Sequence, residues 1–168
     1  MVKPILQLEN LVVELRAKEP ARRMRAREAL VHIGKPAVQS LIGLLSDSSE
    51  HVRWEACKAL ASIKDPAASM PLVQALQDDS IEVQWLAAEG LIALKSKCVI
   101  PLLESLEENF ESSSLRQGAH HVLHALERQK LLRKETVAVV DSLRSLQPVV
   151  AVGVAARKAL LALKKTSR

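Results

Sequence analysis

The sequence predicts an all-α chain, a right-handed α-solenoid of about five helix pairs forming one domain over residues 1–168. Three observations predict it: a short apolar motif returns about every 30 residues, a second motif alternates with it, and turn-forming residues separate the two. Self-similarity at this period, with two helices per unit, is typical of stacked helical repeats. One helix pair cannot bury its apolar stripe alone, so each unit solves the same packing problem with the same residue types.

The first motif places Ala, Ala or Gly, Leu, and Ile or Leu at positions i, i+3, i+4 and i+7, with a looser fourth copy. This spacing puts the four side chains on one helical face. Successive anchor leucines are 30, 31, 32 and 37 residues apart, and the longest step holds an insertion around residues 127–135. We expect each copy to form a helix, called first-type here: Ala26–Ile33, Ala56–Ile63, Ala87–Leu94, Ala119–Leu126 and Ala156–Leu163.

The second motif is an apolar pair followed three residues later by leucine, and it defines the second-type helices. Its copies are Leu11-Val12 with Leu15, Leu41-Ile42 with Leu45, Leu72-Val73 with Leu76, Leu102-Leu103 with Leu106, and Val139-Val140 with Leu143. The chain should therefore open with a second-type helix and close with a first-type helix, giving about ten helices.

Turn and capping signals stand between these helices. Gly34-Lys35-Pro36 and Lys64-Asp65-Pro66 end the first two first-type helices. Asp47-Ser-Ser-Glu50 and Asp79-Ser-Ile-Glu82 have the spacing of capping boxes, which predicts Asp at the N-cap of the helix that follows.

Composition excludes several classes of protein. Hydrophobic residues make up 48% of the chain, which argues against disorder. The longest apolar run, Val149 to Ala156, is far shorter than the roughly 20 residues of a membrane helix, so no membrane partner is expected. The start of the chain lacks the clean apolar core of a signal peptide. Cys57 and Cys98 have no second pair, so neither a zinc site nor a disulfide framework is supported, and we expect a cytoplasmic protein.

The stretch from Val52 to Asp79, VRWEACKALASIKDPAASMPLVQALQDD, resembles a HEAT repeat, of the short bacterial kind also seen in phycobilin lyases. The resemblance extends over nearly the whole chain. It implies the fold, but that fold hosts adaptors, chromophore lyases, hydroxylases and a group of DNA glycosylases, so it does not select a function.

Resemblance to other arrays of this family implies that the second-type helices line the concave side. Between their apolar pairs lies a polar stripe whose character changes from repeat to repeat, while the packing positions stay constant. A position released from the repeat rule can encode binding specificity, so we hypothesise that a partner binds here; the alternative is an ordinary solvated face. The stripe consists of Gly43, Gln74, Gln77, Glu104, Glu107 and Asp141.

Two other surfaces are candidates. Trp54 and Trp85 occupy the same repeat position on first-type helices, where they are either packing residues between neighbouring units or aromatic anchors for a partner. Arg22, Arg23, Arg25 and Arg27 could bind an anion, or could form the solvated face of a helix. Arg23, Arg53 and Arg116 share the slot seven residues before the anchor leucine. A slot that follows the repeat period usually serves the fold, through Asp–Arg pairs.

The sequence gives little support for a catalytic or metal-binding site. His120 and His124 lie one helical turn apart, but a metal would need carboxylate partners, so a solvated or neighbour-contacting histidine patch is the preferred interpretation. The iron-holding His-Glu pairs of hydroxylases with this fold are absent. Because neither a Ser-His-Asp set nor a glycine-rich phosphate loop is present, we assign no catalytic residue, metal or cofactor, and we do not expect an enzyme.

Charge is distributed unevenly along the chain. Residues 1–35 carry net +4, residues 36–115 net −7 and residues 116–168 net +8. An acidic centre opposes a continuous phosphate-binding stripe. The leading hypothesis is therefore a non-catalytic protein-interaction module whose partner carries basic residues. The alternatives are nucleic-acid binding through the basic ends, and a chromophore lyase or its partner subunit. The apolar first and last helices also suggest end-to-end self-association, or a chain cut from a longer array.

Overall fold

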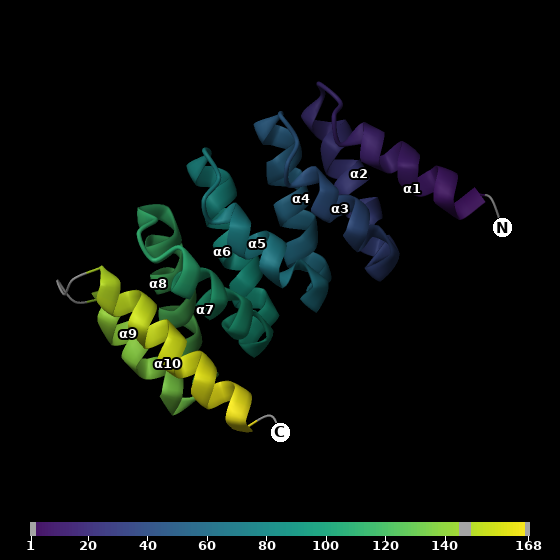
Figure 1. Cartoon of the computed structure of the whole chain (residues 1–168). Helices are drawn as coiled ribbons and strands as arrows, with labels where there is room; N and C mark the ends of the chain where they lie inside the picture. Colours follow the sequence, from purple (N-terminus) through teal and green to yellow (C-terminus); the bar gives the residue numbers. More distant parts are fainter. Residues whose placement is uncertain (1–2, 145–148, 167–168) are drawn as a thin grey trace.

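The computed structural model describes residues 3–144 and 149–166, and within these ranges it consists of α-helices and 3-10 turns without strands (Figure 1). The all-α prediction is confirmed, and the described ranges hold ten helices, which alternate as the two motifs predict as far as α8. Their bounds are α1 Lys3–Glu14, α2 Pro20–Ile33, α3 Val38–Leu44, α4 Glu50–Ile63, α5 Ser69–Ala75, α6 Ile81–Leu94, α7 Val99–Glu108, α8 Ser113–Arg128, α9 Val137–Arg144 and α10 Val150–Thr166.

The repeated apolar positions form the core. Anchor leucines such as Leu30, Leu60 and Leu91 are buried, and the small residues of the motif lie beside them. Small side chains at these positions let neighbouring helices approach closely. A Cβ added at Gly90 would lie 3.0 Å from the side chain of Leu72 in α5, and one added at Gly118 would lie 2.8 Å from that of Leu76, at the end of α5. The buried residues form one continuous cluster from Leu15 to Leu163, as expected for a solenoid rather than separate domains.

The helices form two rows. First-type helices α2, α4, α6 and α8 pack each against the next, and second-type helices α3, α5 and α7 lie along the other side (Figure 1). We call the two sides the first-type face and the second-type face. Each second-type helix packs against the first-type helix that follows it, as α3 does with α4 and α5 with α6. The last repeat departs from this order.

Helix ends follow a repeated plan. A 3-10 turn precedes α3, α5, α7 and α9, and Gly34 enters the first of these with a φ of 72°. The predicted N-caps were one or two residues too early: the caps of α4 and α6 are Ser49 and Ser80. Asp47 and Asp78 instead accept hydrogen bonds from the backbone N–H groups of Ser49 and Ser80, each at 2.9 Å, and so shape the turn before the cap.

The final repeat exchanges its helices between the rows. Sequence predicts α9 as second-type and α10 as first-type, yet α9 packs against α8 whereas α10 packs chiefly along α7 and α9. Figure 1 shows α10 beside α7, as the next member of the second-type row. Gly153 permits this contact, because a Cβ there would lie 2.8 Å from Cδ1 of Phe110, in the loop after α7. The second-type face therefore consists of α3, α5, α7 and α10.

Both cysteines are buried and free. Burial raises the pKa of the Cys57 thiol to about 12 and that of Cys98 to about 12, so neither forms the reactive thiolate near neutral pH. We expect the folded protein to react with maleimide at pH 7.5 at least a hundredfold more slowly than the unfolded chain, measured by mass spectrometry after timed quenching. Fast labelling of either cysteine under native conditions would show that its helix opens readily.

None of the helices in the described ranges combines the length and apolar character needed to cross a membrane.

Candidate functional site

An open groove runs between α3 and α5 on the second-type face. Its volume is about 270 Å³, and its lining combines the half-buried apolar side chains Ile42, Leu45 and Pro71 with the exposed amides of Gln74 and Gln77. We call it the inner groove.

Gly43 keeps the surface beside this groove open, since a Cβ added there would meet nothing within 4 Å. Of the predicted stripe, Gln74 and Gln77 thus line the inner groove, and Gly43 is exposed on α3 next to Ile42. Half-buried apolar side chains next to exposed amide groups suit a peptide segment, because the amides can hydrogen-bond its backbone.

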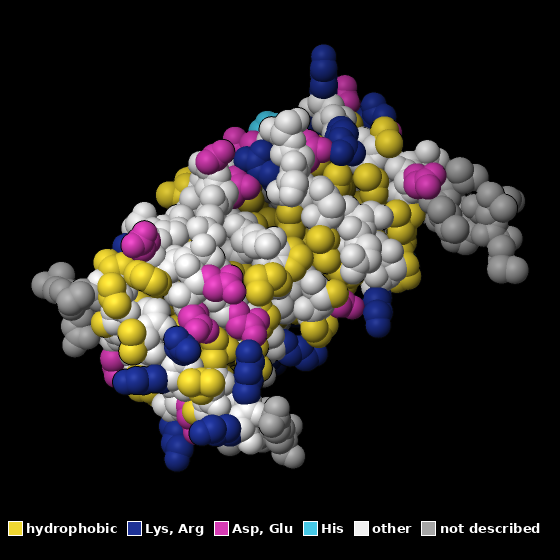
Figure 2. Space-filling view, in the orientation of Figure 1, with side chains coloured by type: hydrophobic (Ala, Val, Ile, Leu, Met, Phe, Trp, Pro, Cys, Tyr) yellow, Lys and Arg dark blue, Asp and Glu magenta, His cyan; other side chains and the backbone are white. Residues whose placement is uncertain are grey.

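The two glutamates of the stripe already have partners within the chain. Lys164 Nζ on α10 donates a hydrogen bond to Glu104 Oε1 at 3.1 Å, and Arg157 Nε lies 3.7 Å from Glu107 Oε1. Figure 2 shows these charges as acidic side chains over α7 next to basic side chains over α10. Both pairs are largely solvent-exposed, so their contribution to stability is small. They do, however, lower the attraction that α7 alone would exert on a basic partner.

Asp141 falls outside the predicted stripe. It is exposed on α9, which lies in the first-type row, and it lines a groove of about 730 Å³ between α9 and α10 at the end of the array. The exposed Val150, Val154 and Leu161 of α10 give this end an apolar character. End-to-end self-association, expected from sequence, therefore stays a prediction for this surface.

The residue seven positions before the anchor leucines of α2, α4, α6 and α8 forms a hydrogen bond within the chain that supports the fold. Its side chain donates a hydrogen bond to the carbonyl oxygen six residues earlier in each of four repeats: Arg23 to Ala17, Arg53 to Asp47, Gln84 to Asp78 and Arg116 to Phe110, at 2.6–3.0 Å. Glutamine replaces arginine without losing this bond. Arg53 also forms a two-point ion pair with Asp78, at 2.7 and 2.8 Å. The Asp–Arg interpretation is thus confirmed for this pair.

The arginine cluster of α2 is largely engaged by carboxylates of the same chain. Arg22 forms a two-point pair with Glu14, at 2.6 and 2.8 Å. Glu55 accepts a hydrogen bond from Arg27 at 2.7 Å and has Arg23 Nε at 3.7 Å. Arg25 is exposed and has no ion pair of this kind within the described ranges. An incoming anion would therefore have to compete with existing ion pairs at three of these four arginines.

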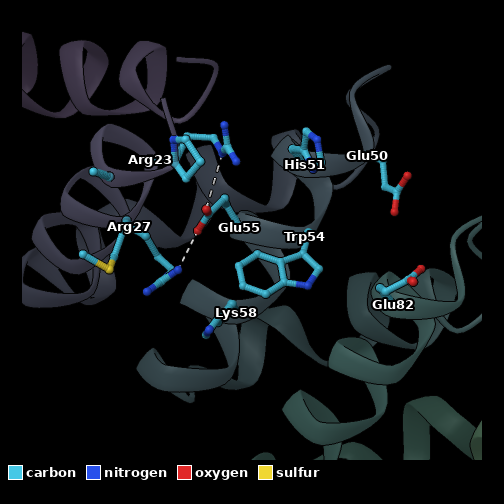
Figure 3. Close-up of a pocket in the computed structure, with 11 residues that line it drawn as sticks. Arg23, Arg27, Glu50, His51, Trp54, Glu55, Lys58 and Glu82 are labelled. Atoms are coloured by element: carbon cyan, nitrogen blue, oxygen red, sulfur yellow. Dashed lines mark hydrogen bonds and ion pairs between the residues drawn. The ribbon is translucent and has the colours of Figure 1, made fainter. Parts of the chain in front are cut away.

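A second groove opens between α2 and α4 on the first-type face, with the start of α6 at its edge. Its volume is about 590 Å³, and half-buried Trp54 lies at its centre (Figure 3). Lys58 Nζ lies 4.4 Å and the Arg27 guanidinium 5.9 Å from the centre of the Trp54 ring, both as cation–π contacts. Glu50, His51 and Glu82 stand at the opposite end. We call this the tryptophan groove.

Trp85 is the more exposed of the two tryptophans, with 57% of its surface accessible. Its ring contacts that of His121 at a centroid separation of 4.9 Å, and His121 Nε2 lies 3.2 Å from Glu89 Oε1. Trp54 thus packs against its neighbours, whereas Trp85 projects from the surface. The interpretation of this repeat position as a packing residue therefore fits Trp54, and the interpretation as an exposed aromatic anchor fits Trp85.

The histidines of α8 form a patch with α9. The rings of His120 and His124 stack at a centroid separation of 5.8 Å, and Arg144 on α9 donates a hydrogen bond to Nδ1 of His124. Glu127 also pairs with Arg144, at 2.7 Å. Within the described ranges, no three His, Cys, Asp or Glu side chains gather as a metal ion would require.

The histidine patch makes stability depend on pH. Burial, then the nearby charges of His124, Arg144 and His121, lower the pKa of His120 in the folded protein. The unfolded chain therefore binds this proton more readily, and stability should fall as pH drops below about 6.5, the ordinary histidine value. We expect the urea midpoint to fall between pH 7 and 5, and His120→Gln to reduce that fall more than the control His121→Gln does. Equal slopes in wild type and His120→Gln would contradict this assignment.

Comparison with known proteins supports the family. Residues 8–80 match the family model described as HEAT repeats. The carbonyl bonds and buried motif found in that region continue through α6 and α8. Residues 8–80 of the chain therefore consist of HEAT repeats. No curated protein matches this chain in sequence.

A solved chain of a phycocyanin lyase complex shows the same fold. One chain of the complex of CpcE and CpcF of phycocyanin lyase from Nostoc sp. PCC7120 is similar over 92% of this chain and 98% of its own, with 24% identity and a TM-score of 0.59. An engineered protein matches over 90% and 77%, with 23% identity and a TM-score of 0.45. A designed armadillo repeat protein in complex with the peptide (KR)4 matches over 91% and 81%, with 22% identity and a TM-score of 0.42.

One buried residue of these HEAT repeats, Glu55, was not identified from the sequence. Glu55 is buried between Arg23 and Arg27, although its slot holds Arg25 in the preceding repeat and Leu86 in the next. A carboxylate in a slot that holds arginine in the repeat before and leucine in the repeat after, one repeat from an arginine cluster, was the available signal.

Proposed function

We propose that this protein is a non-catalytic interaction module, an adaptor or scaffold acting in the cytoplasm, and that its partner binds along α3 and α5. The observation that carries the proposal is the inner groove, where apolar Ile42 and Leu45 lie beside exposed Gln74 and Gln77. Exposed apolar side chains bordered by amides are typical of a surface that binds peptide segments.

The partner should carry basic residues, because residues 36–115 have a net charge of −7. Part of that charge is neutralised by α10 at Glu104 and Glu107. The apolar side chains and the amides of the inner groove should therefore contribute to affinity alongside charge. The two buried, free cysteines agree with a reducing compartment.

Affinity capture from native lysate, with and without nuclease, tests this function. Charge reversal at Glu104 and Glu107 would also break the pairs with α10, so the better variant is Gln74→Lys with Gln77→Lys. Its matched control is Gln117→Lys with Gln129→Lys, the same change at exposed amides of α8 and its C-terminal end. We expect to capture a stoichiometric protein whose recovery is unchanged by nuclease. The control variant should recover as much of it as wild type does, and the inner-groove variant at least tenfold less.

Other outcomes favour the alternatives. Recovery that collapses with nuclease would point to nucleic acid and to the basic ends. Bilin transfer in a reconstituted assay would indicate lyase activity, the alternative that the family resemblance leaves open. Equal capture of a stoichiometric protein by wild type and the inner-groove variant would mean that the partner binds another surface.

A further inference from the structure

One repeat position on the first-type face holds large apolar side chains that are exposed or only half-buried. Met24, Trp54 and Trp85 stand six residues before the anchor leucines of α2, α4 and α6. Met24 is 45% and Trp85 57% exposed, and Ile81, one turn before Trp85, is 73% exposed. Aromatic residues form only 2% of the chain. Placing both tryptophans in this row leaves an apolar patch across three consecutive helices, a feature that marks interaction sites.

The patch is hollowed at its centre. The tryptophan groove has Trp54 at its floor, with Met24 and Ala21 of α2 on one side. Its volume of about 590 Å³ is enough for one or two side chains of a partner. In Figure 3 the indole ring lies between Arg27, Glu55 and Lys58 at one end and Glu50, His51 and Glu82 toward the other.

The carboxylates at the two ends of the tryptophan groove differ in how far basic side chains neutralise them. At the α2 end, buried Glu55 is neutralised by Arg23 and Arg27. At the α6 end, Glu50 Oε1 and Glu82 Oε2 lie 2.9 Å and 3.0 Å from the same hydroxyl oxygen, that of Ser80.

A hydroxyl has one proton, so Ser80 can donate to only one of these carboxylates at a time. The two exposed negative charges therefore stand together beside an apolar groove. A cation brought by a partner would relieve their repulsion.

We infer that the tryptophan groove is a second docking surface, which takes a protein segment carrying an apolar side chain next to a lysine or arginine. The apolar side chain lies against Trp54 and Met24, and the basic group lies between Glu50 and Glu82. This surface is on the opposite side of the array from the inner groove, so one chain could hold two partner segments at once. The inference goes beyond the proposed function and does not depend on the inner groove.

Tryptophan fluorescence gives a direct test, because Trp54 and Trp85 are the chain's two tryptophans and it has no tyrosine. In Trp85→Phe, emission reports on Trp54 alone. The probes are two capped synthetic peptides, one built of four Leu-Lys pairs and one of four Leu-Glu pairs. We expect saturable change with the Leu-Lys peptide, and at least tenfold weaker binding of the Leu-Glu peptide.

Variants locate the binding. In the Trp85→Phe background, Glu50→Gln with Glu82→Gln should weaken Leu-Lys peptide binding about tenfold, with circular dichroism confirming an unchanged fold. The inner-groove variant, Gln74→Lys with Gln77→Lys, should bind that peptide as before, which separates this inference from the proposed function. Equal affinity for both peptides, indifference to the Glu50 and Glu82 changes, or no change in emission up to 1 mM peptide (a weak-binding limit of about 4 kcal/mol) would overturn it.

Discussion

Replacing Glu55 by glutamine is expected to lower the free energy of unfolding by about 3 kcal/mol. The Glu55 side chain is 6% exposed, and those of Arg23 and Arg27 are each 13% exposed. Breaking a buried ion pair from one side leaves the other charge without compensation, and here two guanidinium groups lose the same carboxylate. Glutamine keeps the shape but presents an amide N–H to these donors. Urea unfolding followed by tryptophan fluorescence measures the loss.

A second variant separates lost charge from lost packing. Combining Glu55→Leu with Arg27→Met removes the close 2.7 Å pair while keeping side-chain volume, and should be less destabilised than Glu55→Leu alone, since an apolar replacement of a buried pair is often nearly neutral. A loss below about 1 kcal/mol for Glu55→Gln, the range of exposed pairs, would mean that solvent reaches this site and that Glu55 does not tie α2 to α4.

Replacing Asp78 by alanine is expected to cost about 3 kcal/mol as well, because it removes the two-point pair with Arg53 and the hydrogen bond from the Ser80 N–H. The Asp78 side chain is 8% exposed. Burial acts to raise the pKa of Asp78, but the hydrogen bonds from Arg53 and Ser80 lower it overall. Its stabilising contribution is therefore present above the ordinary carboxyl value of about 3.9 and is lost as pH falls through the lower folded pKa.

Asp47 is the matched control, since it fills the same slot one repeat earlier. It accepts the equivalent hydrogen bond from Ser49, but its arginine partner, Arg16, is 48% exposed. Asp47→Ala should therefore cost about 1 kcal/mol, the value of one hydrogen bond from a backbone N–H plus an exposed ion pair. Equal losses for the two variants would assign the whole effect to the turn and none to the Arg53 pair.

Most of the fold could be predicted because its interactions repeat. The motif positions of α2, α4 and α6 face the same neighbours in each unit, so their spacing alone identifies the buried face. The arginine slot was also predictable, since a position that returns with the repeat period usually serves the fold. The N-caps were misplaced because Asp and Ser both cap helices, and only geometry shows that Asp47 and Asp78 brace the turn while Ser49 and Ser80 occupy the cap.

The exchange of α9 and α10 could not be predicted from the motif. Ala156, Ala159, Leu160 and Leu163 of α10 are buried as a first-type helix requires, but against α7 rather than α8. An apolar stripe specifies that a face is covered and not which helix covers it. The 37-residue step of the last repeat was the local sign of altered geometry. This exchange carries Asp141 away from the stripe and brings Lys164 and Arg157 beside Glu104 and Glu107.

The central claim, that a partner covers the inner groove, can be tested by cysteine labelling, because the native cysteines are buried and both have raised pKa values. Single substitutions Gln74→Cys, Gln77→Cys and Asp141→Cys would each be labelled with maleimide, free and bound to the captured partner. The account predicts that bound partner slows labelling at positions 74 and 77 at least tenfold and leaves position 141 unchanged. Protection at position 141 with free reaction at positions 74 and 77 would contradict it.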